Sequence, residues 1–497
     1  MTKKFFWADK IAEKLIKEKG NLKEFVCASG ITPSGKVHIG NFREVITTDL
    51  VVKSLEKKGK KVKFIYSWDD FDRFRKVTLG ISPDYEKYLG MPISDIPYPF
   101  KDNLSYAEHF EKEFEKSLEK VGIKPHFVRQ SLMNKKCTYA SLIKLAIEKR
   151  NEIKKILDKY RKEPLEKNWY PVTIYCEKCK KDFTKVLSVK DYIIEYSCEC
   201  GYKGNVDFSK KGIVKAPWRV DWPMRWKYEN VAFEPGGIDH SVEGGSFTTS
   251  KEIVKKVFGE EAPVYVFYDW VKIKGGKEFS SSTGNALTLD EVEEIYEPEI
   301  IRYLFVGTKP KTGFQISFDN DVIKIYEDYD NLEEKYYEEK LNTQEKRIYE
   351  LSQIKISKKK PKKLGFRHLV ALVQANKLEG LSKESLFRAE KVRNWLEKYA
   401  GEDMAFRVQK KINFNFSNLE KKALIELKNF LKINKNISEE DLFKGFYEIC
   451  QKVEIKNSDF FRVAYLAIIG KEKGPRLANL ISTIGLDKII KLLEQIK

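Results

Sequence analysis

The sequence predicts an α/β protein whose parallel-sheet domain is split by a cysteine-bearing insertion and followed by an all-helical region. Three observations predict this architecture. Residues 25–31 and 61–68 have strand patterns and flank a helical stretch at 40–57, which is typical of a βαβ unit. Four cysteines lie in two close pairs between residues 176 and 200. From Asp319 onward, the chain is nearly all amphipathic helix with few glycines.

Length, charge and cysteine content narrow the class of protein. A chain of 497 residues exceeds the size at which one hydrophobic core stops growing, so we expect several modules. The net charge of +19 suits a surface that binds nucleic acid, although a lysine-rich proteome explains it equally well. No apolar run approaches the roughly 18 residues of a membrane-spanning helix. Seven cysteines, an odd number, favour metal binding in a reducing compartment. We therefore expect a cytoplasmic protein with no membrane partner.

The segment ASGITPSGKVHIGNFRE, residues 28–44, follows the first predicted strand. Gly30, Pro33 and Gly35 bend the chain there, and a helix opens near His38. Glycines let a nucleotide approach the backbone, and a helix N-terminus offers free N–H groups to phosphate. His38 can donate to phosphate oxygens whose charge grows during displacement. Alone, such a turn is more often structural than catalytic.

A second segment, GKEFSSSTGN at 276–285, follows the strand predicted at 262–273. It places Lys277 and three serines on a loop that can close over a triphosphate. In this order and with a long insertion between them, the two segments resemble the His-Ile-Gly-His and Lys-Met-Ser-Lys-Ser motifs of class I aminoacyl-tRNA synthetases. The resemblance predicts a Rossmann-like catalytic domain. Its expected catalytic residues are His38, Lys277, Ser280, Ser281 and Ser282.

Both motifs depart from the class pattern. Asn41 stands where the second His is expected, and this HIGN ending is similar to that of the lysine-specific branch of the class. Glu278 and Ser281 stand where lysines are expected, so Lys277 must supply the charge that binds pyrophosphate, or Lys272 and Lys274 must do so. Segments 67–77, 216–226 and 234–247 also resemble the lysine branch. The resemblance implies an ATP site formed by Pro33, Ser34, Gly35, His38, Gly40, Asn41, Gly236, Gly237, Asp239 and His240.

The same resemblance makes lysine the expected amino acid, and a cation requires a carboxylate or an aromatic face. Near the motifs, the sequence offers both kinds of group. Asp70 or Asp72, beyond the second strand, can hold the α-ammonium group. A structural core explains the tryptophans about equally well, and a solvated loop is the alternative for the aspartates. The expected lysine-binding residues are Gly30, Thr32, Asp70, Trp218, Asp221, Trp222 and Tyr268.

The cysteine pairs predict a structural zinc site. Cys176 and Cys179 are separated by two residues, Cys198 and Cys200 by one, and eighteen residues lie between the pairs. Such spacing brings two knuckles together around one tetrahedral ion. With four thiolate ligands the ion has no open position, so we expect it to hold the insertion together rather than take part in the reaction.

The C-terminal helices carry Arg and Lys beside Trp395, Tyr399 and Phe406, as a surface that stacks unpaired bases would. A solvated helix face explains those charges equally well. The resemblance implies an α-helical anticodon-binding domain here. The expected modules are the first half of the catalytic domain at 1–84, the zinc-bearing insertion at 85–212, the second half at 213–318, a helical connector at 319–365 and the anticodon-binding domain at 366–497.

The function implied is that of a lysine–tRNA ligase (EC 6.1.1.6). With ATP and Mg²⁺ it forms lysyl-adenylate and transfers lysine to the terminal ribose of lysine tRNA, acting as a monomer. Alternatives are a class I synthetase for glutamate or arginine, a nucleotidylyltransferase, and a tRNA-binding paralogue without catalysis. The intact PSGKVHIGN segment opposes the last alternative, and the altered serine loop favours it.

Overall fold

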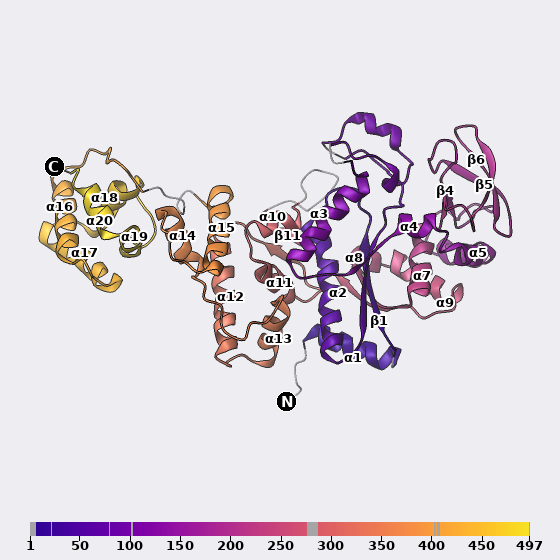
Figure 1. Ribbon diagram of the computed structural model, residues 1–497, viewed down its shortest axis with the longest axis horizontal. Coiled ribbons are helices and arrows are strands. Elements are labelled where there is room, and N and C mark those ends of the chain that lie inside the picture. Colours follow the sequence, from indigo (N-terminus) through magenta and orange to yellow (C-terminus); the bar gives the residue numbers. More distant parts are fainter. Residues whose placement is uncertain are drawn as a thin grey trace. The chain divides into compact units, whose positions relative to one another are not determined.

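The computed structural model describes residues 6–20, 22–78, 80–100, 103–275, 287–401, 404 and 408–496. The chain forms two compact units, which we describe separately (Figure 1). The first unit comprises Met1–Glu293, Ile301–Ile316 and Leu341–Lys355, and the second comprises Glu294–Ile300, Ser317–Lys340 and Ile356–Lys497. No helix in the described ranges is both long and apolar enough to cross a membrane.

A five-stranded parallel sheet forms the centre of the first unit. Its strands are β1 (Phe25–Ile31), β2 (Val62–Trp68), β3 (His126–Arg129), β9 (Val231–Gly237) and β10 (Val264–Tyr268), in the order β10-β9-β1-β2-β3. The first five residues of β1 are buried, as expected for a strand with both faces of its sheet covered. The chain proceeds from β1 toward β3 on one side and returns to β9 and β10 on the other. This reversal opens a crevice at the carboxyl edge of the sheet, where α/β proteins bind ligands.

Helices cover the sheet and complete the first unit. The central helix α2 (Ile39–Lys57) contacts β1, β2 and β9, and thirteen of its residues are buried. Arg302 of α11 (Pro298–Val306) is fully buried and pairs with Asp49 of α2 at 2.6 Å, which ties the two helices together. The other helices and strands around the sheet are α1 (Trp7–Lys19), α7 (Trp218–Glu229), α8 (Ile238–Ser241), α9 (Ser246–Lys256), β11 (Val271–Ile273), α10 (Leu289–Glu293), β12 (Phe314–Ile316) and α13 (Thr343–Ser352).

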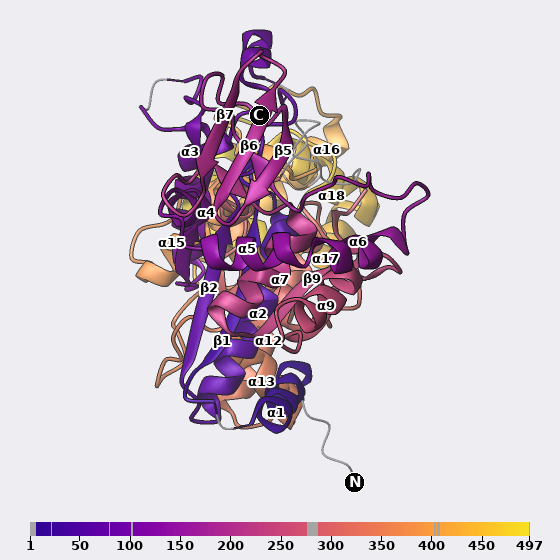
Figure 2. The same ribbon diagram turned by 90° about the vertical axis from the view of Figure 1, so that its right-hand side faces the viewer.

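The insertion between β2 and β9 contains short helices and an antiparallel sheet. Strands β5 (Thr184–Lys190), β6 (Ile193–Cys198) and β7 (Lys203–Asp207) run side by side (Figure 2), and β4 (Thr173–Ile174) pairs with β8 (Val214–Lys215). The helices are η1 (Pro83–Tyr88), η2 (Ile93–Asp95), α3 (Tyr106–Lys120), α4 (Gln130–Lys135), α5 (Ala140–Glu148) and α6 (Arg150–Asp158). Strand β3 belongs to the central sheet although it lies within 85–212, which corrects the expectation that this range is wholly an insertion. Four residues at a sheet edge carry too little pattern to be recognised.

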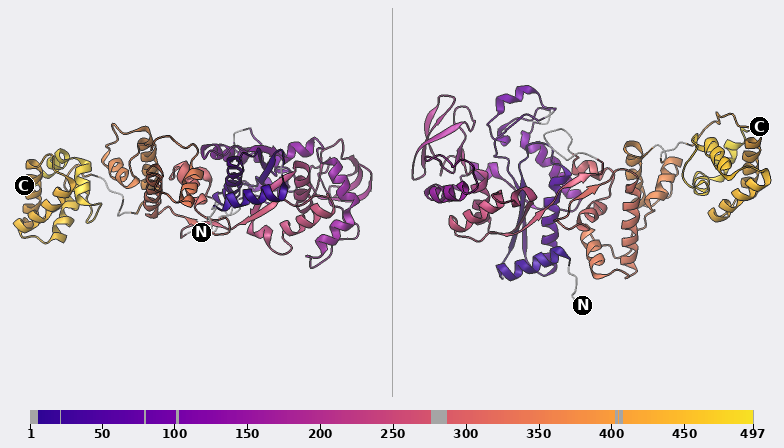
Figure 3. Two further views of the ribbon diagram at one scale, coloured as in Figure 1. Left: turned by 90° about the horizontal axis from the view of Figure 1, so that it is seen from below. Right: turned by 180° about the vertical axis from the view of Figure 1, so that it is seen from behind.

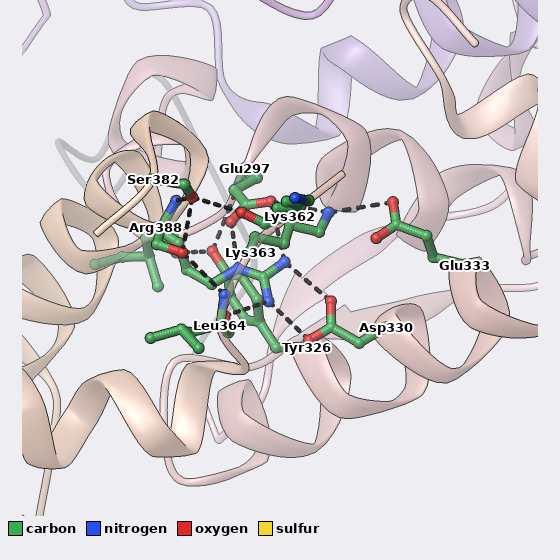
Figure 4. Close-up of polar contacts among 11 residues, drawn as sticks. Glu297, Tyr326, Asp330, Glu333, Lys362, Lys363, Leu364, Ser382 and Arg388 are labelled. Carbon is green, nitrogen blue, oxygen red and sulfur yellow. Dashed lines mark hydrogen bonds and ion pairs between the residues drawn. The ribbon is translucent and has the colours of Figure 1, made fainter. Parts of the chain in front are cut away.

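In the described residues of the second unit, every regular element is a helix (Figure 3). Arg388 is fully buried and donates to Glu297 and Asp330 at 2.5–3.2 Å (Figure 4). Trp395 is also fully buried and donates to the carbonyl of Phe318 at 2.9 Å, so the prediction that it stacks bases is wrong. The helices are α12 (Asp321–Tyr337), α14 (Phe366–Ala375), α15 (Lys383–Lys398), α16 (Asn418–Ile433), α17 (Glu439–Val453), α18 (Asn457–Ile469), α19 (Leu477–Ile484) and α20 (Leu486–Leu493).

Candidate active site

Two cavities lie at the carboxyl edge of the parallel sheet. The larger, of about 310 Å³, is lined by the ends of β1 and β2 and the start of α7. The smaller, of about 220 Å³, is lined by the start of α2 and the residues that follow β9 and β10. Asn41, His240 and Tyr268 line both cavities. The two cavities are therefore neighbours, as a two-substrate reaction requires.

The first motif forms the turn between β1 and α2, as predicted. Asn41 accepts a hydrogen bond from the backbone N–H of His38 at 3.2 Å, which closes the first turn of α2. A Cβ at Gly30 would lie 2.5 Å from the Ser67 carbonyl oxygen, and one at Gly40 would lie 2.9 Å from the His38 ring. Burial lowers the pKa of His38, so its imidazole is neutral at pH 7.

The serine-rich loop predicted to close over the triphosphate lies outside the described residues, and with it Lys277, Ser280, Ser281 and Ser282. The chain that leaves the loop is described. The backbone N–H of Ile39 donates to the carbonyl of Leu287 at 2.8 Å, and Thr288 forms a β-bridge with His38. The chain that follows the second motif is therefore bonded to the start of α2.

The larger cavity contains four of the predicted lysine-binding residues and a carboxylate that the sequence analysis missed. Gly30, Thr32, Trp218 and Tyr268 line it, and so does Glu44 of α2. Asn41 and Glu44 are three residues apart and share a helix face, a spacing that could have identified the carboxylate.

Both oxygens of Glu44 are engaged within the cavity wall. One accepts from the backbone N–H of Gly30 at 2.9 Å, and the other accepts from the Tyr268 hydroxyl at 2.7 Å. In the described part of the chain, no Lys or Arg forms an ion pair with Glu44. Burial raises the pKa of this carboxyl to about 8. Glu44 is therefore mostly protonated in the empty cavity at pH 7, and it must release its proton to pair with a cationic ligand.

Three other predicted residues are close to the cavity without lining it. Asp70 is buried, and both its oxygens accept hydrogen bonds from Ser131, one of them from the backbone N–H at 2.7 Å. Asp221 is buried and pairs with Arg225 at 3.3 Å. Trp222 stacks behind Trp218, with ring centroids 5.0 Å apart. Neither Asp70 nor Asp221 lines the cavity, and their assignment as lysine ligands stays a prediction.

Two other aspartates line the cavity, both on the loop that leaves β2. Asp69 pairs with Arg225 at 2.7 Å. Asp72 forms an ion pair with Lys215 and accepts from the Thr32 hydroxyl at 3.1 Å. Burial opposes ionisation of Asp72, but the Lys215 ammonium outweighs it and lowers the pKa of the carboxyl. The wall of the cavity therefore contains two aspartates that are each paired with a buried cation, and the exposed Arg75 lines it as well.

The smaller cavity contains six of the predicted ATP-binding residues. The four other predicted residues do not line it: Pro33, Ser34, Gly35 and Gly236. A Cβ at Gly236 would lie 2.5 Å from the Tyr265 hydroxyl oxygen, so this glycine permits close packing. Trp270 is half-exposed and lines the cavity, and its ring offers a stacking face that the sequence analysis missed. The predicted residues that line this cavity are His38, Gly40, Asn41, Gly237, Asp239 and His240.

The four predicted zinc ligands come together in the insertion. The Sγ atoms of Cys176, Cys179, Cys198 and Cys200 all lie within 4.8 Å of one another. The Cys176–Cys200 and Cys179–Cys198 sulfur pairs are 3.7 and 3.6 Å apart. Tetrahedral Zn–S bonds of about 2.3 Å place sulfurs about 3.8 Å apart, so the set fits one zinc ion.

Comparisons with known proteins agree with this arrangement. The family model described as tRNA synthetases class I (K) matches residues 5–355, and a model described as an anticodon binding domain matches residues 389–497. A lysine–tRNA ligase from Borreliella burgdorferi is 45% identical and covers 98% of each chain. One from Pyrococcus horikoshii is 37% identical over 98% of this chain and 99% of its own. The chain therefore belongs to the class I tRNA synthetases, in the family designated K.

Among solved structures, a glutamate tRNA ligase from Elizabethkingia meningosepticum superposes with a TM-score of 0.47. Its sequence identity is 13%, and the match covers 95% of this chain and all of that one. This likeness is too weak to say more about the present chain.

Proposed function

We propose that the chain is a lysine–tRNA ligase of class I (EC 6.1.1.6), which activates lysine with ATP and attaches it to lysine tRNA. The observation that carries the proposal is the carboxyl-lined cavity beside the HIGN turn, in which Glu44 has no cationic partner among the described residues. It combines Glu44, Asp69 and Asp72 with the aromatic rings of Trp218 and Tyr268. Relatives named lysine–tRNA ligases that match nearly the whole chain support the same conclusion.

Lysine carries two ammonium groups and one carboxylate, and the larger cavity suits that charge pattern. We assign the side-chain ammonium to Glu44, because no protein cation neutralises this carboxylate in the described residues. We assign the α-ammonium to Asp72, one of the two aspartates that the sequence offered for it, with Asp69 beside it. The lysine carboxylate then faces the smaller cavity across the shared residues Asn41 and His240. Glutamate is disfavoured at the Glu44 end of the cavity, because its side-chain carboxylate would meet a carboxyl group there; Arg75, which also lines the cavity, is exposed.

We place ATP in the smaller cavity, with Trp270 beside the adenine and Asp239 near the ribose. The lysine carboxylate attacks the α-phosphorus and pyrophosphate leaves in line. Neutral His38 and the positive end of the α2 dipole stabilise the charge that develops on the phosphate oxygens. We assign binding of the departing pyrophosphate to Lys277 and to the three loop serines, Ser280, Ser281 and Ser282. Mg²⁺ bound to the triphosphate would neutralise part of its charge.

We propose a structural role for zinc at the four cysteines, and tRNA binding by the helices at 366–497. With β3 assigned to the catalytic domain, the other predicted module boundaries, the monomeric state and the cytoplasmic location remain part of this proposal. The exposed Tyr399 remains a candidate for stacking a base, whereas Phe406 lies outside the described residues.

Aminoacylation of a lysine tRNA transcript tests the function. Purified protein is supplied with ATP, Mg²⁺ and, in parallel, lysine, glutamate or arginine. Charging with lysine alone is the expected result. Charging with arginine or glutamate would keep the class and overturn the assignment of the cavity. Binding of tRNA without any charging would identify the chain as the non-catalytic paralogue.

A further inference from the structure

The loop that leaves β2 carries the cavity aspartates, and the zinc-bearing insertion packs directly against it. The loop comprises residues 69–73. On the side of the sheet, Asp69 donates its backbone N–H to the Ile31 carbonyl at 2.9 Å. On another side, the N–H groups of Ile93 and Ser94 donate to the carbonyls of Asp72 and Asp70, each at 2.9 Å. Side chains outside the cysteine module also bond to the loop, Arg225 at Asp69, Ser131 at Asp70 and Thr32 at Asp72. Further contacts come from residues beside the cysteines.

Tyr175 immediately precedes the zinc ligand Cys176 and is almost fully buried. Its hydroxyl donates to the backbone carbonyl of Phe71 at 2.7 Å, and the two rings meet edge to face at 5.0 Å. A hydrogen bond from a buried tyrosine hydroxyl to a backbone carbonyl fixes the distance between that peptide group and the backbone that carries the tyrosine. The middle of the loop is therefore held by a residue adjacent to the metal site.

Lys215 ends the insertion and lies opposite Thr173 in the β4–β8 ladder. It is buried, does not line the cavity and forms an ion pair with Asp72. A third contact joins Asp182, three residues after Cys179, to Arg73 at 3.4 Å. The base of the cysteine module therefore reaches the loop at Phe71, Asp72 and Arg73, three consecutive residues.

We propose that Tyr175 and Lys215 are positioning residues, through which the zinc module holds the loop 69–73 with Asp72 facing the amino-acid cavity. Affinity for the amino acid then depends on zinc at the cysteines, although the metal lies outside the cavity. This inference rests on the proposed function and on zinc as the ion. Loss of zinc frees Cys176 and with it the adjacent Tyr175, so Phe71 loses its hydrogen bond to the module, whereas Asp69 and Asp70 keep their bonds to Arg225 and Ser131.

Calorimetric titration of the full-length protein with lysine tests the dependence on metal. The protein is compared before and after zinc removal by a chelator and dialysis, with the zinc content measured in parallel. We expect the Kd for lysine to rise at least about tenfold on zinc loss and to recover when ZnCl₂ is returned. The Kd for ATP without Mg²⁺ should change less than about twofold. An unchanged Kd for lysine in protein shown to lack zinc would overturn the proposal.

Point variants separate positioning from general loss of folding, because they keep all four cysteines. Tyr175→Phe removes one hydroxyl and should raise the Kd for lysine about threefold, and Lys215→Met should raise it at least about tenfold. Lys215→Arg should restore most of the affinity. The matched controls are Tyr202→Phe and Lys211→Met, whose side chains bond to Glu177 inside the module. Equal effects of the controls and the test variants would refute the positioning role.

The failure of this inference is distinguishable from failure of the proposed function. If the zinc-loaded protein binds another amino acid instead of lysine, the proposed function is wrong. The positioning role is then tested with that amino acid, because every amino acid carries the α-ammonium assigned to Asp72. A protein that binds no amino acid would overturn both.

Discussion

Glu44 provides the sharpest test of the amino-acid site. The variant Glu44→Gln keeps the shape of the side chain and an acceptor for the Gly30 N–H, and it removes the negative charge. Truncating one partner of a buried, hydrogen-bonded charge pair costs about 3 kcal/mol. Ionising a carboxyl with a pKa of about 8 at pH 7 costs about 1.4 kcal/mol, which the wild-type protein must supply before it binds lysine. The net loss at pH 7 is therefore about 1.6 kcal/mol, roughly 15-fold in Kd.

The sign of the pH dependence follows from the raised pKa. Below about pH 8 the empty cavity holds Glu44 mostly protonated, and binding of an ammonium group expels that proton. Wild-type affinity should therefore rise with pH, by about tenfold per unit between pH 6 and 7.5, where lysine keeps both positive charges. The affinity of the Glu44→Gln variant should be nearly flat. The penalty of the substitution then grows from about twofold at pH 6 to about 50-fold at pH 7.5.

Calorimetry in two buffers of different ionisation enthalpy measures both quantities. We expect close to one proton released per lysine bound by the wild type at pH 7, and none by the Glu44→Gln variant. Glu234 is the matched control, because burial raises its pKa to about 7 and it does not line the larger cavity. If Glu44→Gln retains the wild-type pH slope, or Glu234→Gln abolishes it, the assignment of the side-chain ammonium to Glu44 is wrong.

Three further predictions address the rest of the molecule. His38→Ala should slow pyrophosphate exchange about 100-fold in the presence of tRNA and leave the Kd for lysine unchanged; a normal rate would remove its catalytic role. Asp72→Asn should raise the Kd for lysine about tenfold and Asp70→Asn less than about threefold, and the reverse order in titrations would restore Asp70 as the ligand. Arg388→Met removes the guanidinium that binds the carboxylates of Glu297 and Asp330, and it should lower the free energy of unfolding by about 3–5 kcal/mol. Urea unfolding followed by tryptophan fluorescence measures this loss, and a loss below about 1 kcal/mol would contradict the prediction.

The sequence by itself determined the features that depend on local pattern. The parallel α/β core, the insertion and the helical C-terminal region are confirmed. They could be predicted because the hydrophobic periodicity of a helix or strand depends only on its own residues. Membership of the class I synthetases is also confirmed by the family match over residues 5–355. The spacing of the cysteines predicted a metal cluster, and their sulfurs are gathered as one zinc ion requires. Short-range order and spacing were sufficient for each of these features.

Only the tertiary structure decided which side chains face the ligand. The sequence offers Asp69, Asp70 and Asp72 as near equivalents, and the choice depends on Ser131, Arg225 and Lys215, each more than fifty residues away in the chain. Glu44 meets Tyr268 only because α2 and β10 are brought together by the sheet. Burial of Trp395 likewise depends on contacts across the helical unit. The charge and exposure of each of these side chains depend on partners that are distant in the sequence. A local sequence pattern therefore does not predict them.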